Sequence, residues 1–209
     1  MHMWTSNILL ALELLATAAF ALSGVIEATR KRMDVFGVCV VGFLTAFGGG
    51  TLRDVLMDRR PFFWVEHQYA LVGVLLLCVV AMSVMRLRHL EQTARTIQWP
   101  DAMGLGLFCA TGVHQAWSLG MPYLVAIMMG VIAATFGGVL RDLICNEVPV
   151  LFRDHRPYAL CAIAGGVGYG LVQVTPADDW LAIAACVVVT TGLRVLTLWR
   201  DWRLPQWRG

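Results

Sequence analysis

Hydrophobic residues along the chain fall into seven long runs that are separated by short polar segments. The runs cover residues 7–27, 35–57, 69–86, 101–118, 121–142, 158–175 and 179–199. An α-helix of about 20 residues crosses the hydrocarbon core of a bilayer. The pattern therefore predicts an all-α integral membrane protein with seven transmembrane helices. It leaves no stretch long enough for a separate soluble domain.

One polar motif inside these runs occurs twice. Residues 47–54 read FGGGTLRD in the second run, and residues 135–142 read TFGGVLRD in the fifth. The shared glycines and the Arg-Asp pairs are 88 positions apart. Other matches at this offset pair Phe20 with Phe108, Gly24 with Gly112, Glu13 with Asp101, Glu27 with Gln115, Pro61 with Pro149 and His67 with His155.

These matches define two repeats of three spans each. We assign residues 6–88 to repeat one, 89–99 to an inner linker, 100–176 to repeat two, and 177–209 to a seventh helix and tail, all within one membrane domain, 1–209. Because each repeat has an odd number of spans, the copies are predicted to lie upside down relative to each other. Inverted repeats are typical of transport proteins whose site lies at the repeat interface.

The charge distribution predicts the orientation of the chain. With the N-terminus outside, thirteen of the sixteen Lys and Arg residues lie in inner segments. The positive-inside rule therefore favours an N-terminus outside and a C-terminus inside. We expect the chain to lie in the bacterial inner membrane. The remaining three, Arg53, Arg59 and Arg60, all follow the first glycine cluster.

The two glycine clusters lie inside the second and fifth spans. Their members are Gly48, Gly49, Gly50, Gly137 and Gly138. Each glycine costs about 1 kcal/mol relative to Ala in a helix, so the clusters predict helices that are broken or kinked near the membrane centre. Carbonyl groups at such a break favour a bound cation. The alternative interpretation is close helix packing through small residues.

The charged pairs Arg53-Asp54 and Arg141-Asp142 follow the glycines. Neighbouring residues on a helix do not face each other, so we expect each member to find a partner elsewhere. The acidic candidates are Glu13, Glu27 and Asp101, preferably in a network that crosses between the repeats. Each pair either sets the field in a pore or is a structural salt bridge.

Ionisable and polar residues inside spans are functional candidates by default. Glu13 shares a helical stripe with Thr17, Phe20, Gly24 and Glu27. Asp101, His114 and Gln115 lie in the fourth span, and the alternative for Glu27, Asp101 and Gln115 is a place at headgroup depth. Secondary pore candidates are Thr45, Thr51, Thr135, Asp101 and Gln115.

Enzyme chemistry and metal binding find no support in the sequence. The six cysteines are scattered singly, without a CxxC or a Cys/His cluster, which argues against a metal site or a disulfide framework. There is no HExxH, phosphate loop or dinucleotide fingerprint. Ser23 with His114 is the nearest approach to a nucleophile and base, but position 21 is Ala where an intramembrane serine protease needs glycine. We expect no enzyme activity and no cofactor.

The duplicated glycine-Arg-Asp motif, with its repeats and extra span, resembles the prokaryotic trimeric intracellular cation (TRIC) channels, a family that also carries a "glycine transporter" domain label. The resemblance covers roughly residues 6–200. It implies a homotrimer with one pore per protomer, lined by the glycine-kinked second and fifth helices. It also implies monovalent cations and membrane lipid as partners, without nucleic acid. One departure is Phe136, which stands where a third glycine would be.

The sequence therefore leads to one main hypothesis, a passive K⁺/Na⁺ channel. The rival hypothesis is a secondary transporter of a small solute such as glycine, for which inverted repeats and a buried Glu13 are equally natural. A purely structural membrane scaffold is the third.

Overall fold

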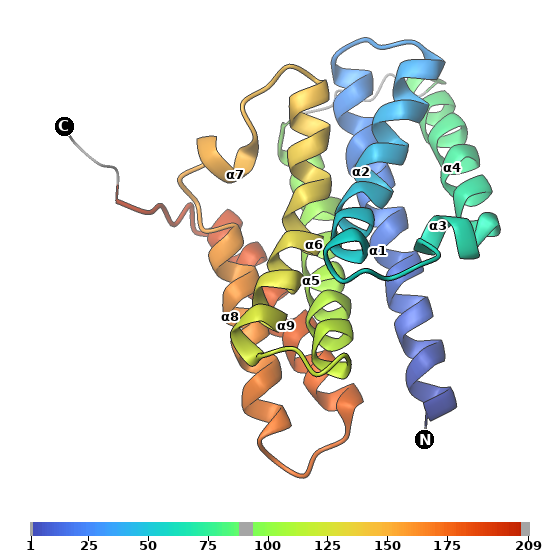
Figure 1. The fold of residues 1–209 in the computed structure, drawn as a ribbon. Helices are drawn as coiled ribbons and strands as arrows, with labels where there is room; N and C mark the ends of the chain where they lie inside the picture. The colour runs from blue at the N-terminus through green and yellow to red at the C-terminus, as the bar shows by residue number, and fades with distance from the viewer. Residues whose placement is uncertain (1, 88–93, 206–209) are drawn as a thin grey trace.

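The computed structural model describes residues 2–87 and 94–205, and within these ranges the chain is all-helical (Figure 1). The prediction of an all-α fold is confirmed. The described residues form seven longer helices and two four-residue helices, α3 and α7. The bounds are α1 His2–Arg30, α2 Val35–Leu56, α3 Phe63–Glu66, α4 Gln68–Leu87, α5 Ala94–Ser118, α6 Tyr123–Ile144, α7 Val150–Arg153, α8 Ala159–Gln173 and α9 Asp179–Trp199.

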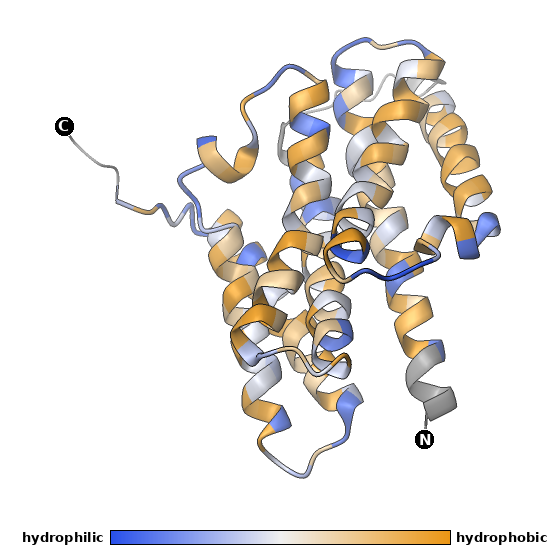
Figure 2. Ribbon diagram, in the orientation of Figure 1, coloured by the Kyte–Doolittle hydropathy of each residue, from blue (hydrophilic) through white to orange (hydrophobic). Residues whose placement is uncertain are grey.

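Most of the long helices have the composition of membrane spans. Five of them, α1, α2, α4, α6 and α9, are long and apolar enough to cross a membrane. Figure 2 shows hydrophobic residues over most of their length and hydrophilic residues gathered in the connecting loops. Helix α8 is shorter, at 15 residues, and α5 begins in the polar segment before Pro100. That all seven cross the membrane stays a prediction.

Equivalent helices of the two repeats run antiparallel. On α1 and α5, Phe20 packs against Phe108 with ring centroids 5.3 Å apart, and Glu13 accepts a hydrogen bond from Gln115. Residue numbers therefore increase along α1 in the direction in which they decrease along α5. In Figure 1 the two helices likewise run in opposite directions, with the loop after α1 and the loop after α5 at opposite ends of the bundle. This is the geometry of an inverted repeat.

Helices α2 and α6 cross at the glycines in a two-fold manner. A Cβ on Gly49 would overlap the backbone carbonyl oxygen of Ala133, and a Cβ on Gly137 would overlap that of Thr45. The two contacts are equivalent in the repeats, because Gly137 lies 88 positions after Gly49 and Ala133 lies 88 positions after Thr45. Only glycine at these two positions allows the backbones to approach so closely.

The glycine clusters do not break the helices in this structure, and a kink at the clusters stays a prediction. Helix α2 continues from Val35 to Leu56 and α6 from Tyr123 to Ile144 without interruption. Glycine has a low helix propensity. Packing between the two helices offsets this cost here, because the missing side chains let the two backbones approach. The alternative interpretation, close packing, describes Gly49 and Gly137. A place in a pore for these glycines stays a prediction.

Two residues near helix starts play different parts. Asp34 caps α2, since its side chain accepts a hydrogen bond of 2.7 Å from the Gly37 amide. Pro100, in contrast, does not begin a helix but lies inside α5, which starts at Ala94. The segment 94–99 extends the helix beyond the apolar run, and one helical hydrogen bond is lost at the proline nitrogen.

The crossing predicts a sharp difference between glycines of the same chain. Gly49→Val or Gly137→Val forces α2 and α6 apart, and such overpacking costs about 1–3 kcal/mol or more. At about 2–4 °C per kcal/mol, the midpoint of thermal unfolding in detergent should fall by several degrees. The matched control is Gly73→Val on α4, where a Cβ meets open space. An equal shift for all three variants would contradict the crossing as described.

Candidate functional site

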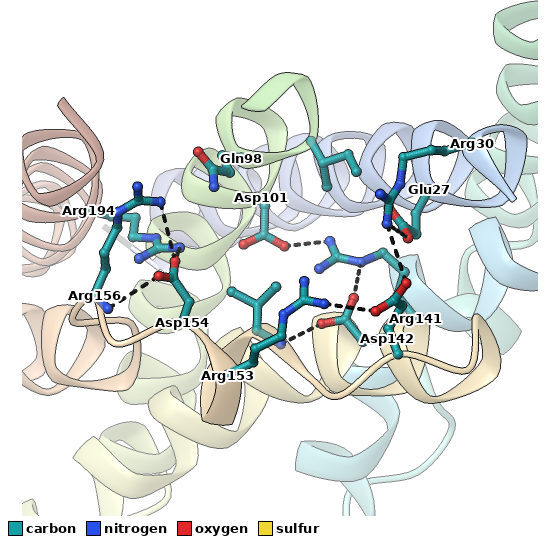
Figure 3. Close-up of a pocket in the computed structure, with 13 residues that line it drawn as sticks. Glu27, Arg30, Gln98, Asp101, Arg141, Asp142, Arg153, Asp154, Arg156 and Arg194 are labelled. Atoms are coloured by element: carbon teal, nitrogen blue, oxygen red, sulfur yellow. Dashed lines mark hydrogen bonds and ion pairs between the residues drawn. The ribbon is translucent and has the colours of Figure 1, made fainter. Parts of the chain in front are cut away.

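Two polar cavities lie at opposite ends of the repeat pair. The repeat-one cavity has a volume of about 290 Å³ and the repeat-two cavity about 260 Å³. The first is lined by Asn7, Leu9, Leu10, Glu13, Arg53, Asp54, Arg59, Pro61, Phe63, Glu66, His67 and Gln115. The second, drawn in Figure 3, is lined by Glu27, Arg30, Ile97, Gln98, Asp101, Arg141, Asp142, Glu147, Val150, Arg153, Asp154, Arg156 and Arg194.

The repeat-two cavity is built around a buried arginine on α6. Arg141 donates from Nη1 to Asp101 Oδ1 at 2.7 Å and from Nε to Asp142 Oδ1 at 2.8 Å. Figure 3 shows its guanidinium between the two carboxylates. The same Nη1 also donates to the hydroxyl of Ser23 on α1. The backbone amide of Val150 donates to the second oxygen of Asp142 at 2.7 Å.

The repeat-one cavity holds the equivalent triad on α1 and α2. Arg53, which is fully buried, donates from Nη2 to Glu13 Oε1 at 2.6 Å and to Asp54 Oδ1 at 2.7 Å. Its Nε also donates to Asp54 Oδ1, at 2.9 Å. Each triad thus contains one guanidinium and two carboxylates, 88 positions from its counterpart.

The arginines bind two of the predicted acidic candidates, Glu13 and Asp101, but two other expectations about these charged pairs are wrong. Each arginine binds the aspartate next to it in sequence, because the long side chain reaches back to a carboxylate that faces the same neighbouring helix. The salt bridges also stay within each repeat, from Arg53 to Glu13 and from Arg141 to Asp101. Hydrogen bonds cross between the repeats instead, as in the contact of 3.4 Å between Gln115 Nε2 and Glu13 Oε2.

An aromatic pair lies between the two cavities. Along α1, Glu13 lines the repeat-one cavity, Phe20 is fully buried two turns later, and Glu27 lines the repeat-two cavity. Helix α5 repeats this order in reverse, with Phe108 in the middle. The predicted α1 stripe is therefore buried along its length. In this conformation the Phe20–Phe108 pair separates the two polar spaces.

The glycines that flank the crossing face the triads. A Cβ on Gly50 would lie 3.8 Å from the Phe108 ring, and one on Gly138 would lie 3.5 Å from Asp101 Oδ1. Gly48 instead faces the side chain of Leu140. Gly50 is therefore close to the Phe20–Phe108 pair, and Gly138 is close to the repeat-two triad.

The three threonine candidates form hydrogen bonds away from the two charged cavities. Thr45 and Thr135 are buried, and each hydroxyl donates to a carbonyl one turn earlier in its own helix, at 2.6 and 2.8 Å. The Thr51 hydroxyl accepts a hydrogen bond of 3.2 Å from the Trp64 indole and borders an apolar groove. None of the three lines either charged cavity.

Sequence reasoning missed an ion-pair cluster at the mouth of the repeat-two cavity. Glu147 pairs with Lys31 and, at 2.8 Å, with Arg153. The hydrogen bond from Lys31 lowers the pKa of Glu147 below its ordinary value. The cluster connects the loop after α1 with the loop after α6, so it joins the two repeats. The run Arg30-Lys31-Arg32 was a signal for a basic loop, but nothing in the sequence identified its partner.

Arg194 on α9 is buried, although it lies near the end of its helix. Its side chain is 1% exposed, and Nη1 donates to the Pro157 carbonyl at 3.1 Å. The guanidinium lies 4.7 Å from the centroid of the Tyr158 ring. The seventh long helix thus contributes a positive charge to the repeat-two cavity, for which repeat one has no counterpart.

His114 and the cysteines do not form a reactive or metal site in the described residues. His114 Nδ1 lies 2.8 Å from the Tyr169 hydroxyl, and Ser23 is bound to Arg141 instead. All six cysteines are free. No group of three or more His, Cys, Asp or Glu residues in the part of the chain that the structure describes is placed to hold a metal ion.

Comparisons with known proteins give a consistent result. The model of the family described as Glycine transporter matches residues 10–86 and 98–173. The inner membrane protein YadS of Escherichia coli K12, also called UPF0126, is 38% identical over 168 residues, or 78% of each chain. The membrane protein YvgT of Bacillus subtilis is 29% identical over 197 residues, which cover 93% of this chain and 94% of that protein.

Solved structures extend the likeness to three dimensions. A TRIC trimeric intracellular cation channel orthologue from Rhodobacter sphaeroides has a TM-score of 0.85 at 34% identity, covering 94% of this chain and all of that one. A prokaryotic TRIC channel in 0.5 M KCl has a TM-score of 0.86 at 26% identity, covering 98% of this chain. The chain is a multi-pass protein of the bacterial inner membrane. It belongs to the family described as Glycine transporter, which is the TRIC family of membrane proteins.

Proposed function

We propose that this protein is a passive channel for the monovalent cations K⁺ and Na⁺. The pore runs between the two cavities of a single protomer, past the Phe20–Phe108 pair, and three protomers form a homotrimer. The N-terminus lies outside, so the repeat-one cavity opens outward and the repeat-two cavity inward. The solved relatives, which are described as trimeric and as cation channels, support the ion class and the assembly.

The observation that carries this proposal is the pair of equivalent charged triads on opposite sides of a thin apolar barrier. Each triad has two carboxylates and one guanidinium, so each carries a net charge of −1 when ionised. A cavity with low-dielectric walls focuses such a charge and raises the local concentration of cations. The whole lining of the repeat-one cavity keeps this net negative charge, so that entrance favours cations over anions. In the lining of the repeat-two cavity, basic residues near the triad balance the carboxylates.

Opening requires movement at the centre. Phe20 and Phe108 are packed tightly in this conformation, and apolar constrictions of this kind exclude water and ions. Separation of the rings would join the cavities beside Gly50, where a Cβ would lie 3.8 Å from the Phe108 ring, and Gly138, where a Cβ would lie 3.5 Å from Asp101 Oδ1. We therefore assign the barrier to the aromatic pair and a place along the route to these two glycines.

A secondary transporter of a small solute such as glycine is the second candidate. The family description favours it. A central barrier between two cavities at opposite ends also suits alternating access equally well. The geometry of Glu13 speaks against a proton-coupled version. Its carboxylate is fixed by a salt bridge of 2.6 Å to Arg53, whereas a coupling carboxylate has to gain and lose protons during transport.

Currents of purified protein in planar bilayers distinguish the two candidates. We expect ohmic single-channel currents with a reversal potential that follows the K⁺ or Na⁺ gradient and not the Cl⁻ gradient. Liposomes from the same preparation should show no coupled uptake of glycine. Saturable, ion-coupled glycine uptake without ohmic currents would contradict the channel and support the transporter.

Removal of the aromatic barrier tests the route. Phe20→Ala and Phe108→Ala should each raise K⁺ flux into liposomes severalfold, because a smaller apolar side chain lets water enter the constriction. Each loss of a ring also costs about 3–5 kcal/mol of stability, so folded protein is first isolated by gel filtration. The matched control is Phe36→Ala at the exposed start of α2. A flux that matches the wild-type protein in both ring variants would place the route elsewhere.

A further inference from the structure

The two triads differ in how completely their polar atoms are bonded. In repeat two, Arg141 reaches both carboxylates and the Ser23 hydroxyl, and Asp142 also accepts the Val150 amide. The position equivalent to Ser23 in the other copy is Thr111. Its hydroxyl donates to the Phe108 carbonyl at 3.3 Å, within its own helix. In repeat two, Arg141 thus binds the Ser23 hydroxyl. In repeat one, the Thr111 hydroxyl binds a backbone carbonyl instead.

Two buried polar atoms in the repeat-one cavity are left without a partner. Among the residues that the structure describes, neither Arg53 Nη1 nor Gln115 Oε1 has a hydrogen-bond partner. Arg53 is fully buried and Gln115 is 8% exposed, and both line this cavity. Leaving such a group unsatisfied costs about 1–3 kcal/mol. Both side chains contact Glu13, so the two unsatisfied atoms belong to the same part of the cavity.

A single ligand can remove both costs only if it has two properties. It must present a positive charge or a donor to the amide oxygen of Gln115, and an acceptor to the guanidinium of Arg53. A bare cation or an anion satisfies one atom alone. A water molecule satisfies both, and so does a cation that retains water, with the ion on Gln115 Oε1 and a water oxygen accepting from Arg53 Nη1.

The charge of the cavity favours the hydrated cation. The lining of the repeat-one cavity contains three carboxylates, Glu13, Asp54 and Glu66, and two guanidinium groups, Arg53 and Arg59, which leaves a net charge of −1 with His67 neutral. The lining of the repeat-two cavity contains five carboxylates and five guanidinium groups, and these charges balance. An uncompensated negative charge in a partly enclosed space attracts a cation more strongly than a neutral molecule.

We propose that the repeat-one cavity contains a binding site for one partly hydrated monovalent cation, held by Gln115 Oε1 and the Glu13 carboxylate, and that the repeat-two cavity has no such site. This assignment rests on the proposed cation-channel function and specifies where along the route the ion binds. A cavity of about 290 Å³ holds an ion with several waters, since each water occupies about 30 Å³. The triad of repeat two then serves to close α5 against α6.

Rubidium is a suitable probe because it substitutes for K⁺ and scatters anomalously. Crystals of the wild-type protein in RbCl should give an anomalous peak beside Gln115 and none beside Asp101. A peak beside Asp101, peaks of equal height in both cavities, or only ordered water beside Gln115 would each overturn the proposal. This measurement needs no variant, so it does not depend on how a mutant folds.

Affinity for Rb⁺ provides the second test, measured as the stabilisation of the detergent-solubilised protein by RbCl against N-methylglucamine chloride. Gln115→Leu removes the amide oxygen but keeps the Glu13–Arg53 bridge, and it should weaken Rb⁺ binding at least about tenfold, which corresponds to about 1.4 kcal/mol. The matched control Ser23→Ala alters the triad of repeat two and should leave Rb⁺ affinity unchanged. Equal affinity in Gln115→Leu and the wild-type protein would refute the site.

The site and the channel can fail separately. K⁺ flux is measured in liposomes from the same preparation. Flux without a Rb⁺ site beside Gln115 would overturn this inference and leave the channel intact. A Rb⁺ site in a protein that passes no ions would contradict the channel and leave the binding site as a fact of the structure.

Discussion

A guanidinium buried inside an apolar bundle is the constraint on which the rest of this structure depends. Arg53 and Arg141 are almost fully enclosed, and removing one partner of such a pair costs about 3–5 kcal/mol. Each arginine therefore needs a carboxylate from the neighbouring helix, and this need connects α2 to α1 and α6 to α5. Because α2 and α6 then meet through Gly49 and Gly137, the two connected pairs form one unit.

The same constraint explains why the polar spaces lie where they do. The triads are at opposite ends of antiparallel helices, so each end of the bundle has its own charged cavity. The centre is left to residues without charge, and Phe20 with Phe108 occupies it. The fold thus places two charged cavities at opposite ends of the bundle, with the Phe20–Phe108 pair between them. The two ends are not identical, since α9 adds Arg194 to the repeat-two side alone.

The fixed offset of 88 made much of this predictable. It identified the repeats, their inversion and the acidic candidates for Arg53 and Arg141, because a duplicated charge inside an apolar span has to be neutralised in the same way twice. It could not show that the glycine helices are continuous. Helix propensity argues for a break there, whereas packing against the Ala133 and Thr45 carbonyls outweighs it. The contact between Glu147 and Lys31, which joins the two repeats, and the contacts of Arg194 on α9 had no second copy to reveal them.

The central claim is that the two cavities are opposite-facing halves of one route. Glu66→Cys in the repeat-one cavity and Gln98→Cys in the repeat-two cavity test it directly, through reaction with a membrane-impermeant thiol reagent in right-side-out and inside-out vesicles. The account predicts that the cysteine at position 66 reacts only from the periplasmic side and the cysteine at position 98 only from the cytoplasmic side. Reaction of both from the same side would contradict it.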